Sequence, residues 1–136
     1  MASEQLSHSS EKKDEYYAAL NEHVLEAAVA SGGKRFLDVG CASGIMGQAL
    51  KQRVAGAEVD GLEYSSKVAG KAREVLDTVV ELDLNSESIP LKGPYDCVIC
   101  GDILEHLVDP WDVLRQLTDR LAPGGTLVTS IPNIRH

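Results

Sequence analysis

The chain has 136 residues, of which 43% are hydrophobic and 25% are charged, as expected for one globular domain with a hydrophobic core. Its net charge of −8 argues against nucleic acid as a partner, because phosphate binding relies on clustered cations. No apolar run approaches the roughly 20 residues of a membrane span, so we expect no membrane association. Residues 1–13 are polar, without the apolar core of a signal peptide, and we expect a frayed tail ahead of a domain over residues 14–136.

The chain contains three cysteines, Cys41, Cys97 and Cys100. They predict reduced thiols and a cytoplasmic protein, because nothing in the sequence marks it for secretion. The spacing Cys97-x-x-Cys100 is also that of half a metal site. In a strand, however, positions three apart face opposite sides of the sheet, so we expect two buried thiols.

Helical and strand-like segments alternate along the chain. Apolar residues first recur at helical spacing over residues 14–30, which predicts a helix that ends at Gly32-Gly33. Its stripe comprises Tyr17, Leu20, Val24 and Ala27. The predicted elements that follow are a strand over 35–39, a glycine turn over 40–44, a helix to about 53, a strand over 58–63, a helix capped by Ser65, a strand over 78–82, a loop over 85–94, a strand over 95–100, a helix capped by Asp109, and a strand over 126–131.

Two of the predicted helices have a clear buried face. Ser65 is a good N-cap for the first of them, and Asp109-Pro110 places proline at the first turn of the second. The buried face of the first comprises Val68, Ala72, Val75 and Leu76. The buried stripe of the second comprises Leu114, Leu117 and Leu121, and the Pro-Gly-Gly run at 123–125 is expected to end that helix.

This alternation predicts an α/β domain with a parallel sheet, in which right-handed crossovers place helices on both faces. A doubly wound, Rossmann-like sheet binds its ligand beyond the carboxyl ends of its strands. Four carboxylates stand at or just after strand ends in this sequence, namely Asp38, Glu63, Asp83 and Asp102. We therefore expect the ligand to meet an acidic edge of the sheet.

The first strand leads into a turn with glycines at Gly40 and Gly44, where the backbone can approach a ligand closely. The N–H groups of the following helix N-terminus favour a carboxylate or a phosphate. At the tip of the second strand, Glu63 can accept both hydrogen bonds from a ribose diol. The other interpretation of Glu63 is a solvated carboxylate at a strand end.

A nicotinamide dinucleotide is the main competing ligand, and its fingerprint is G-x-G-x-x-G. Here Cys41 and Ala42 follow Gly40, and Ile45 stands where the third glycine belongs. The four strand-end carboxylates would also oppose a pyrophosphate. S-adenosylmethionine fits better, because its sulfonium and amino groups are positive and its single carboxylate can use the helix N-terminus.

Five segments, in order and in register, resemble the motifs of class I methyltransferases, and the closest resemblance is to methyltransferase type 11 and methionine-biosynthesis W-like domains. The first, LDVGCASG at Leu37–Gly44, resembles motif I. The later segments are GLEYS at 61–65, ELDLN at 81–85, YDCVICGDILEHL at 95–107 and LAPGGTLVTSIPNIRH at 121–136. The resemblance covers the chain from about Tyr16 to its end.

The resemblance implies S-adenosylmethionine as cofactor, S-adenosylhomocysteine as product, and a role for each matching position. The turn after the first strand would hold the methionyl end, and Glu63 would bind the ribose. Asp83 would take the adenine amino group, although a helix N-cap is the alternative for this residue. The full set of implied cofactor-binding residues is Asp38, Gly40, Cys41, Ala42, Gly44, Glu63, Tyr64, Asp83, Leu84, Gly101, Asp102, Tyr16 and Tyr17. For Tyr16 and Tyr17, simple helix packing is the other interpretation.

The resemblance also implies a strand order of 3-2-1-4-5. Relatives continue through an antiparallel strand pair that helps to form the acceptor pocket, whereas this sequence stops at His136. We therefore expect the fifth strand to be a sheet edge that can pair with a second copy of the chain through Thr126–Ile131.

Methyl transfer is an in-line displacement that depends on proximity and orientation more than on a nucleophilic side chain. His106 is the candidate general base, with Asp102 beside the reacting centre; packing of the turn is the alternative for His106. Asp102, Glu105 and His106 are also spaced i, i+3, i+4, as in the acidic-x-x-Glu-His metal motif of quinone and small-RNA methyltransferases. Here Asp replaces the usual Glu and no fourth ligand is evident, so we expect no metal.

The sequence thus predicts an S-adenosylmethionine-dependent methyltransferase that acts on a small-molecule or glycan acceptor. Two alternatives stay open at this point. One is a non-catalytic cofactor-binding or interaction module, and the other is an NAD-binding oxidoreductase.

Overall fold

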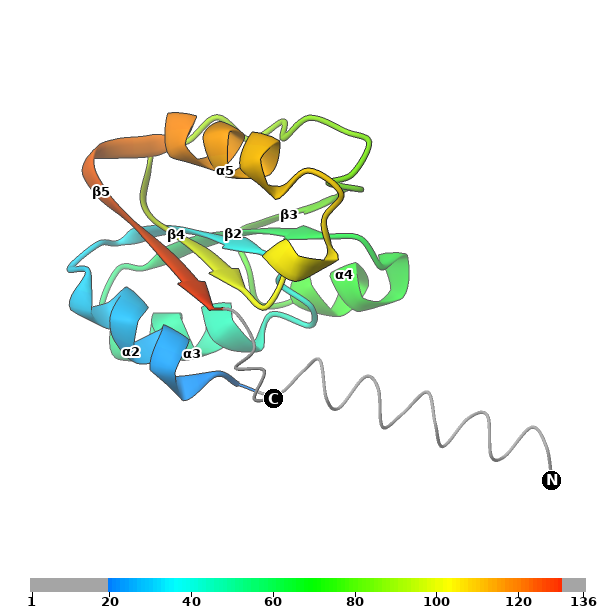
Figure 1. Ribbon diagram of the computed structural model, residues 1–136. Helices are drawn as coiled ribbons and strands as arrows, with labels where there is room; N and C mark the ends of the chain where they lie inside the picture. The colour runs from blue at the N-terminus through cyan, green and yellow to red at the C-terminus, as the bar shows by residue number, and fades with distance from the viewer. Residues whose placement is uncertain (1–19, 131–136) are drawn as a thin grey trace, which may run out of the picture.

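The computed structural model describes residues 20–130, which form a five-stranded parallel sheet with helices on both faces (Figure 1). The strand order is β3-β2-β1-β4-β5, so the predicted doubly wound topology is confirmed. In chain order the elements are α2 Glu22–Ala30, β1 Arg35–Val39, α3 Ile45–Arg53, β2 Glu58–Glu63, α4 Ser66–Ala72, β3 Thr78–Glu81, β4 Tyr95–Gly101, the 3-10 helix η1 Leu104–His106, α5 Pro110–Asp119 and β5 Leu121–Ser130. Over these residues no helix is long and apolar enough to cross a membrane.

The sheet divides the core into two layers. Helices α2, α3 and α4 lie against one face, and α5 lies against the other (Figure 1). Residues of β4 alternate between the layers, because successive side chains of a strand point to opposite faces. Cys97 belongs to the core under α2 and α3, whereas Cys100 belongs to the core under α5. Both thiols are buried and unpaired. This confirms the prediction of two buried thiols.

Helix α2 begins at Glu22, inside the helix predicted over residues 14–30. Asn21 is extended, and its side-chain oxygen accepts a hydrogen bond from the Val24 backbone N–H at 3.1 Å. Asparagine competes for backbone hydrogen bonds in this way and therefore favours helix caps over helix interiors. Residues 14–19, with Tyr16 and Tyr17, lie outside the described residues.

Helix α4 is shorter than its apolar pattern suggests. It ends at Ala72, and both Val75 and Leu76 lie in the turns before β3. The Leu76 side chain is nevertheless buried, and it packs where Gly47 and Gly61 leave no side chain in its way. The apolar spacing therefore predicted the burial of Leu76 correctly, but the helix does not continue to this residue.

The last strand starts earlier than predicted. Leu121 pairs with Tyr95 as the first residue of β5 and is not part of the α5 stripe. The Pro-Gly-Gly run at 123–125 lies inside the strand, where the register jumps from Tyr95↔Leu121 to Cys97↔Thr126. Proline lacks an N–H for the ladder and Gly124 has a φ of 77°, so both suit a bulge.

Candidate functional site

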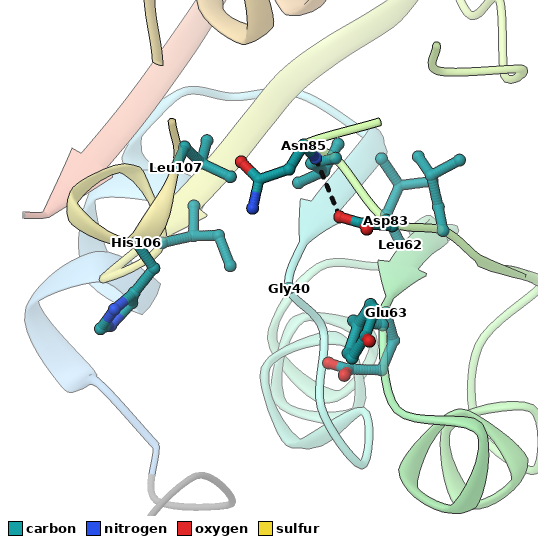
Figure 2. Close-up of a pocket in the computed structure, with 11 residues that line it drawn as sticks. Gly40, Leu62, Glu63, Asp83, Asn85, His106 and Leu107 are labelled. Carbon is teal, nitrogen blue, oxygen red and sulfur yellow. Dashed lines mark hydrogen bonds between the residues drawn. The ribbon is translucent and has the colours of Figure 1, made fainter. Parts of the chain in front are cut away.

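A pocket of about 280 Å³ opens at the carboxyl ends of the strands, where the sequence places the ligand (Figure 2). We refer to it as the strand-end pocket. Six of its lining residues were predicted from the sequence, namely Gly40, Glu63, Tyr64, Asp83, Leu84 and His106. Five were not, namely Leu62, Leu82, Asn85, Ile103 and Leu107.

The turn after β1 depends on its two glycines. Gly40 has a φ of 75°, and a Cβ there would lie 3.0 Å from the Ile103 Cδ1 atom. Gly44 has a φ of 91° at the N-cap of α3, and its Cβ would lie 2.5 Å from the Val75 Cγ2 atom. Between them Ala42 also has a positive φ of 49°, which is uncommon for a residue other than glycine. The chain therefore passes very close to its neighbours before the α3 N-terminus.

Glu63 holds this turn from the tip of β2. One carboxylate oxygen accepts a hydrogen bond from the Ala42 N–H at 2.9 Å, and the other accepts from the Ser65 N–H at 2.8 Å. A solvated strand-end carboxylate would lack such fixed partners. Each oxygen has a second lone pair that can accept another hydrogen bond, and the side chain lines the pocket (Figure 2).

Asp38 is the buried carboxylate of the site, with only 5% of its surface exposed. Burial and, to a smaller extent, the nearby Glu63 carboxylate together raise the pKa of Asp38 to about 7. A cationic group brought to this position would favour the ionised form and lower that pKa again. Asp38 is not part of the pocket lining, and neither are Cys41, Ala42 and Gly44.

Asp83 begins a turn at the end of β3. Its carboxylate accepts a hydrogen bond from the Asn85 N–H at 3.0 Å (Figure 2). Its backbone oxygen accepts from the N–H groups of Ser86 and Glu87. No helix follows within residues 84–94, so the alternative of a helix N-cap is wrong.

The segment after β4 separates residues that the sequence grouped together. Asp102 adopts a φ of 54°, and its carboxylate accepts a hydrogen bond from the Ser130 hydroxyl at 3.1 Å. Neither Gly101 nor Asp102 lines the strand-end pocket, whereas His106 does. The His106 Nε2 atom lies 3.5 Å from a Glu105 carboxylate oxygen, and the His106 side chain is 66% exposed.

The alternative metal site therefore has no structural support. Glu105 and His106 lie on η1, but Asp102 precedes it in a left-handed conformation and is bonded to β5. No group of three metal-binding side chains occurs among residues 20–130. The spacing i, i+3, i+4 would bring the three together only on a regular helix.

The five pocket residues that the sequence did not predict are the polar Asn85 and four apolar residues. Asn85 stands two positions after Asp83, so its place in the motif ELDLN was a usable signal. Ile103 and Leu107 flank His106 and complete the opposite wall. Their apolar side chains and Leu84 give the pocket walls suited to a flat, weakly polar group. Tyr64 stands at its edge with 75% of its surface exposed.

Comparisons with known proteins agree with this geometry. A family model described as a methyltransferase domain matches residues 11–136. Ubiquinone biosynthesis O-methyltransferase from Xanthomonas campestris pv. campestris (strain B100) is 34% identical over 113 residues, covering 79% of this chain and 46% of the relative. The Aeromonas salmonicida protein of the same name is 37% identical over 107 residues, covering 74% and 44%. The chain thus spans about half the length of the curated relatives it matches.

Solved structures share the fold. A methyltransferase in complex with the Haloferax volcanii Trm112 activator superposes with a TM-score of 0.70 at 22% identity, covering 90% of this chain and 54% of that one. The plantazolicin methyltransferase BpumL, solved with S-adenosylhomocysteine, gives 0.63 at 19% identity, covering 73% and 41%. The [4+2]-cyclase SpnF gives 0.65 at 25% identity, covering 85% and 43%.

The sequence resemblance, the strand order and the position of the pocket thus agree with the family match. The chain belongs to the methyltransferase-domain family.

Proposed function

We propose that this chain forms the cofactor-binding part of an S-adenosylmethionine-dependent methyltransferase. The observation that supports this most strongly is Glu63, which reaches the strand-end pocket from the tip of β2 with both oxygens held in place. A fixed carboxylate there suits a neutral ribose diol, because hydroxyl groups donate and the carboxylate only accepts.

The other ends of the cofactor follow from this position. The turn at 40–44 and the buried Asp38 lie toward β1, on the side where the methionyl amino and carboxylate groups would bind. Asp83 and Leu84 lie toward β3, where the adenine would lie with its amino group donating to Asp83. Gly101 and Asp102 would border the sulfonium at the end of β4. Tyr64 would border the adenine. Within this proposal Tyr16 and Tyr17 would close over the cofactor from the chain that precedes α2.

The acid residues also argue against a nicotinamide dinucleotide. Asp38 lies near the end of β1, Glu63 ends β2 and Asp83 follows β3, so all three stand at one edge of the sheet, where a pyrophosphate would be repelled. Ala42 stands where the dinucleotide fingerprint requires its second glycine. The alternative of a module that does not transfer methyl groups is supported by the cyclase SpnF, which shares the fold.

The acceptor in this proposal is a small molecule. The relatives are named for O-methylation in ubiquinone biosynthesis, so a hydroxyl-bearing aromatic compound is the first class to test. His106 borders the pocket and its side chain is largely exposed, so it can take the hydroxyl proton as a general base. Bound S-adenosylmethionine supplies an already activated methyl group, and the protein residues have to hold the acceptor oxygen in line with it.

A turnover assay separates an enzyme from a binding module. The chain is incubated with methyl-labelled S-adenosylmethionine and a panel of catechols, phenols, glycans and amines, and labelled product is measured. Labelled O-methyl product from a phenolic acceptor supports the proposal. Binding of cofactor with no turnover on any acceptor would favour the non-catalytic module.

Two further parts of the proposal concern partners and location. Among the described residues β5 pairs with β4 alone, which supports self-association through the predicted edge Thr126–Ile131, of which Ile131 lies outside the described residues. Sedimentation velocity tests it, and a monomer at high concentration would contradict it.

The free thiols of Cys41, Cys97 and Cys100 support the cytoplasmic location.

A further inference from the structure

Asn85 joins the two walls of the strand-end pocket. It lies on the turn after β3, and its side-chain oxygen accepts a hydrogen bond from the Val108 backbone N–H at 2.9 Å, across 23 positions of sequence. Its own backbone N–H donates to the Asp83 carboxylate at 3.0 Å. The turn that carries Asp83 is therefore fixed to the segment that carries His106.

This hydrogen bond determines which way the amide points. A backbone N–H is a donor only, so the atom that faces Val108 has to be the amide oxygen. The NH2 group must then point to the other side. In Figure 2 it points into the space between His106 and Glu63, and no described residue accepts a hydrogen bond from it. A neutral donor of fixed orientation thus faces the pocket.

The position of this donor matches one part of the proposed ligand. If Glu63 binds the ribose at the end of β2, the base extends toward the end of β3, where Asp83, Leu84 and Asn85 line the pocket. Adenine offers an amino group and, on either side of it, a ring nitrogen that accepts. A carboxylate acceptor beside an amide donor is complementary to that pair.

We propose that Asn85 is a specificity-determining residue that donates its side-chain N–H to a ring nitrogen of the adenine, while Asp83 accepts from the amino group. The proposal rests on the proposed function, because it needs an adenosyl ligand in this pocket. The Asn85 side chain would then have two roles. Its oxygen accepts the hydrogen bond from the Val108 N–H, and its nitrogen donates to the adenine.

Two variants separate these tasks. Asn85→Ala removes both the oxygen and the nitrogen. Asn85→Asp keeps an acceptor for the Val108 N–H but has no N–H to donate. We expect the Asp variant to retain the melting temperature of the wild type, whereas both variants bind S-adenosylhomocysteine about 10-fold more weakly, as for the loss of one hydrogen bond.

Adenosine is the matched probe, because it contains the base and ribose without homocysteine. Both variants should lose the same factor in affinity for adenosine as for S-adenosylhomocysteine. If Asn85→Asp binds both ligands like the wild type, Asn85 only holds the loop and the proposal is wrong. Loss confined to S-adenosylhomocysteine would equally overturn it. Failure of the wild type to bind either ligand would instead overturn the proposed function.

Discussion

A hydrogen bond of 2.9 Å joins the Ala42 backbone N–H to a carboxylate oxygen of Glu63. It ties the end of β2 to the turn after β1, at a residue whose φ of 49° is costly for alanine. The second oxygen holds the Ser65 N–H at the start of α4. Glu63 therefore has a structural role in addition to the proposed contact with ribose.

Replacing Glu63 with alanine should weaken both folding and ligand binding. We expect affinity for S-adenosylhomocysteine to fall by about 1–3 kcal/mol, because charged hydrogen bonds to the ribose are lost. Glu63→Gln keeps one acceptor oxygen but places an NH2 group against a backbone N–H, so it should also bind weakly. Titration calorimetry of both variants measures the loss, and unchanged affinity in Glu63→Ala would remove Glu63 from the site.

Asp38 should make stability depend on pH. Its pKa of about 7 in the folded protein exceeds the ordinary value near 3.8, so the folded state holds this proton more tightly than the unfolded state. The free energy of unfolding should therefore fall as pH rises from about 4 to 7. Asp38→Asn removes the buried charge and should be more stable than the wild type at pH 8 by roughly 2–4 kcal/mol. Urea unfolding at pH 5 and pH 8 tests this.

The same carboxylate should make ligand binding depend on pH in the opposite sense. Only ionised Asp38 attracts the amino group of the cofactor. Affinity for S-adenosylhomocysteine should therefore rise between pH 6 and 8 in the wild type and stay flat in Asp38→Asn. A flat profile in the wild type would place the amino group elsewhere.

Gly44 should not tolerate a side chain. Gly44→Ala would have to hold a φ of 91° and place its Cβ 2.5 Å from the Val75 Cγ2 atom. We expect a loss of about 1–3 kcal/mol in unfolding free energy, with weaker ligand binding as the turn shifts. Gly70→Ala in α4 is the matched control, because nothing lies within 4 Å of its Cβ and alanine favours a helix. Equal stability of the two variants in thermal unfolding would contradict this account.

Arg120 should matter for stability although it is remote from the pocket. Its guanidinium donates to the backbone oxygens of Ile89, Leu91 and Gln116 at 2.6–2.7 Å, which fastens the loop after β3 to α5. Arg120→Ala should cost about 2–4 kcal/mol of unfolding free energy, because three acceptors lose a charged donor.

Arg115 provides the control for that experiment. It lies on α5, the helix that Arg120 follows as C-cap, with a side chain that is 72% exposed and a long 3.8 Å ion pair to Asp112. Arg115→Ala should stay within about 0.5 kcal/mol of the wild type. A similar loss in both variants would mean that charge, not the three carbonyl contacts, explains the effect of Arg120.

The strands could be predicted because their information is local, whereas their order was implied by the resemblance to class I methyltransferases. Short strand-like segments such as Arg35–Val39 and Glu58–Glu63 were predicted with their observed bounds. The ends of elements depend on contacts between distant residues. Leu121 joins β5 because Tyr95 offers it a partner strand, and Leu76 leaves α4 because Gly47 and Gly61 make room for it. Neither partner is visible in the local pattern.

The candidate site divides in the same way. Residues at strand ends, such as Glu63 and Asp83, could be placed because parallel strands finish at one edge. Asn85 acquires its position from Val108, which is remote in sequence. Asp102 was predicted to lie beside the reacting centre, whereas in the structure its carboxylate accepts a hydrogen bond from the Ser130 hydroxyl of β5. Hydrogen bonds of this kind depend on the folded structure and not on a motif.

The claim on which everything else depends is that an adenosyl ligand binds at the ends of β1, β2 and β3. Calorimetric titration of the chain with S-adenosylhomocysteine and, separately, with NADH tests it most directly. We predict saturable binding of S-adenosylhomocysteine that is weakened by about 1–3 kcal/mol in Glu63→Ala, and no heat from NADH. Saturable binding of NADH without any binding of S-adenosylhomocysteine would contradict it.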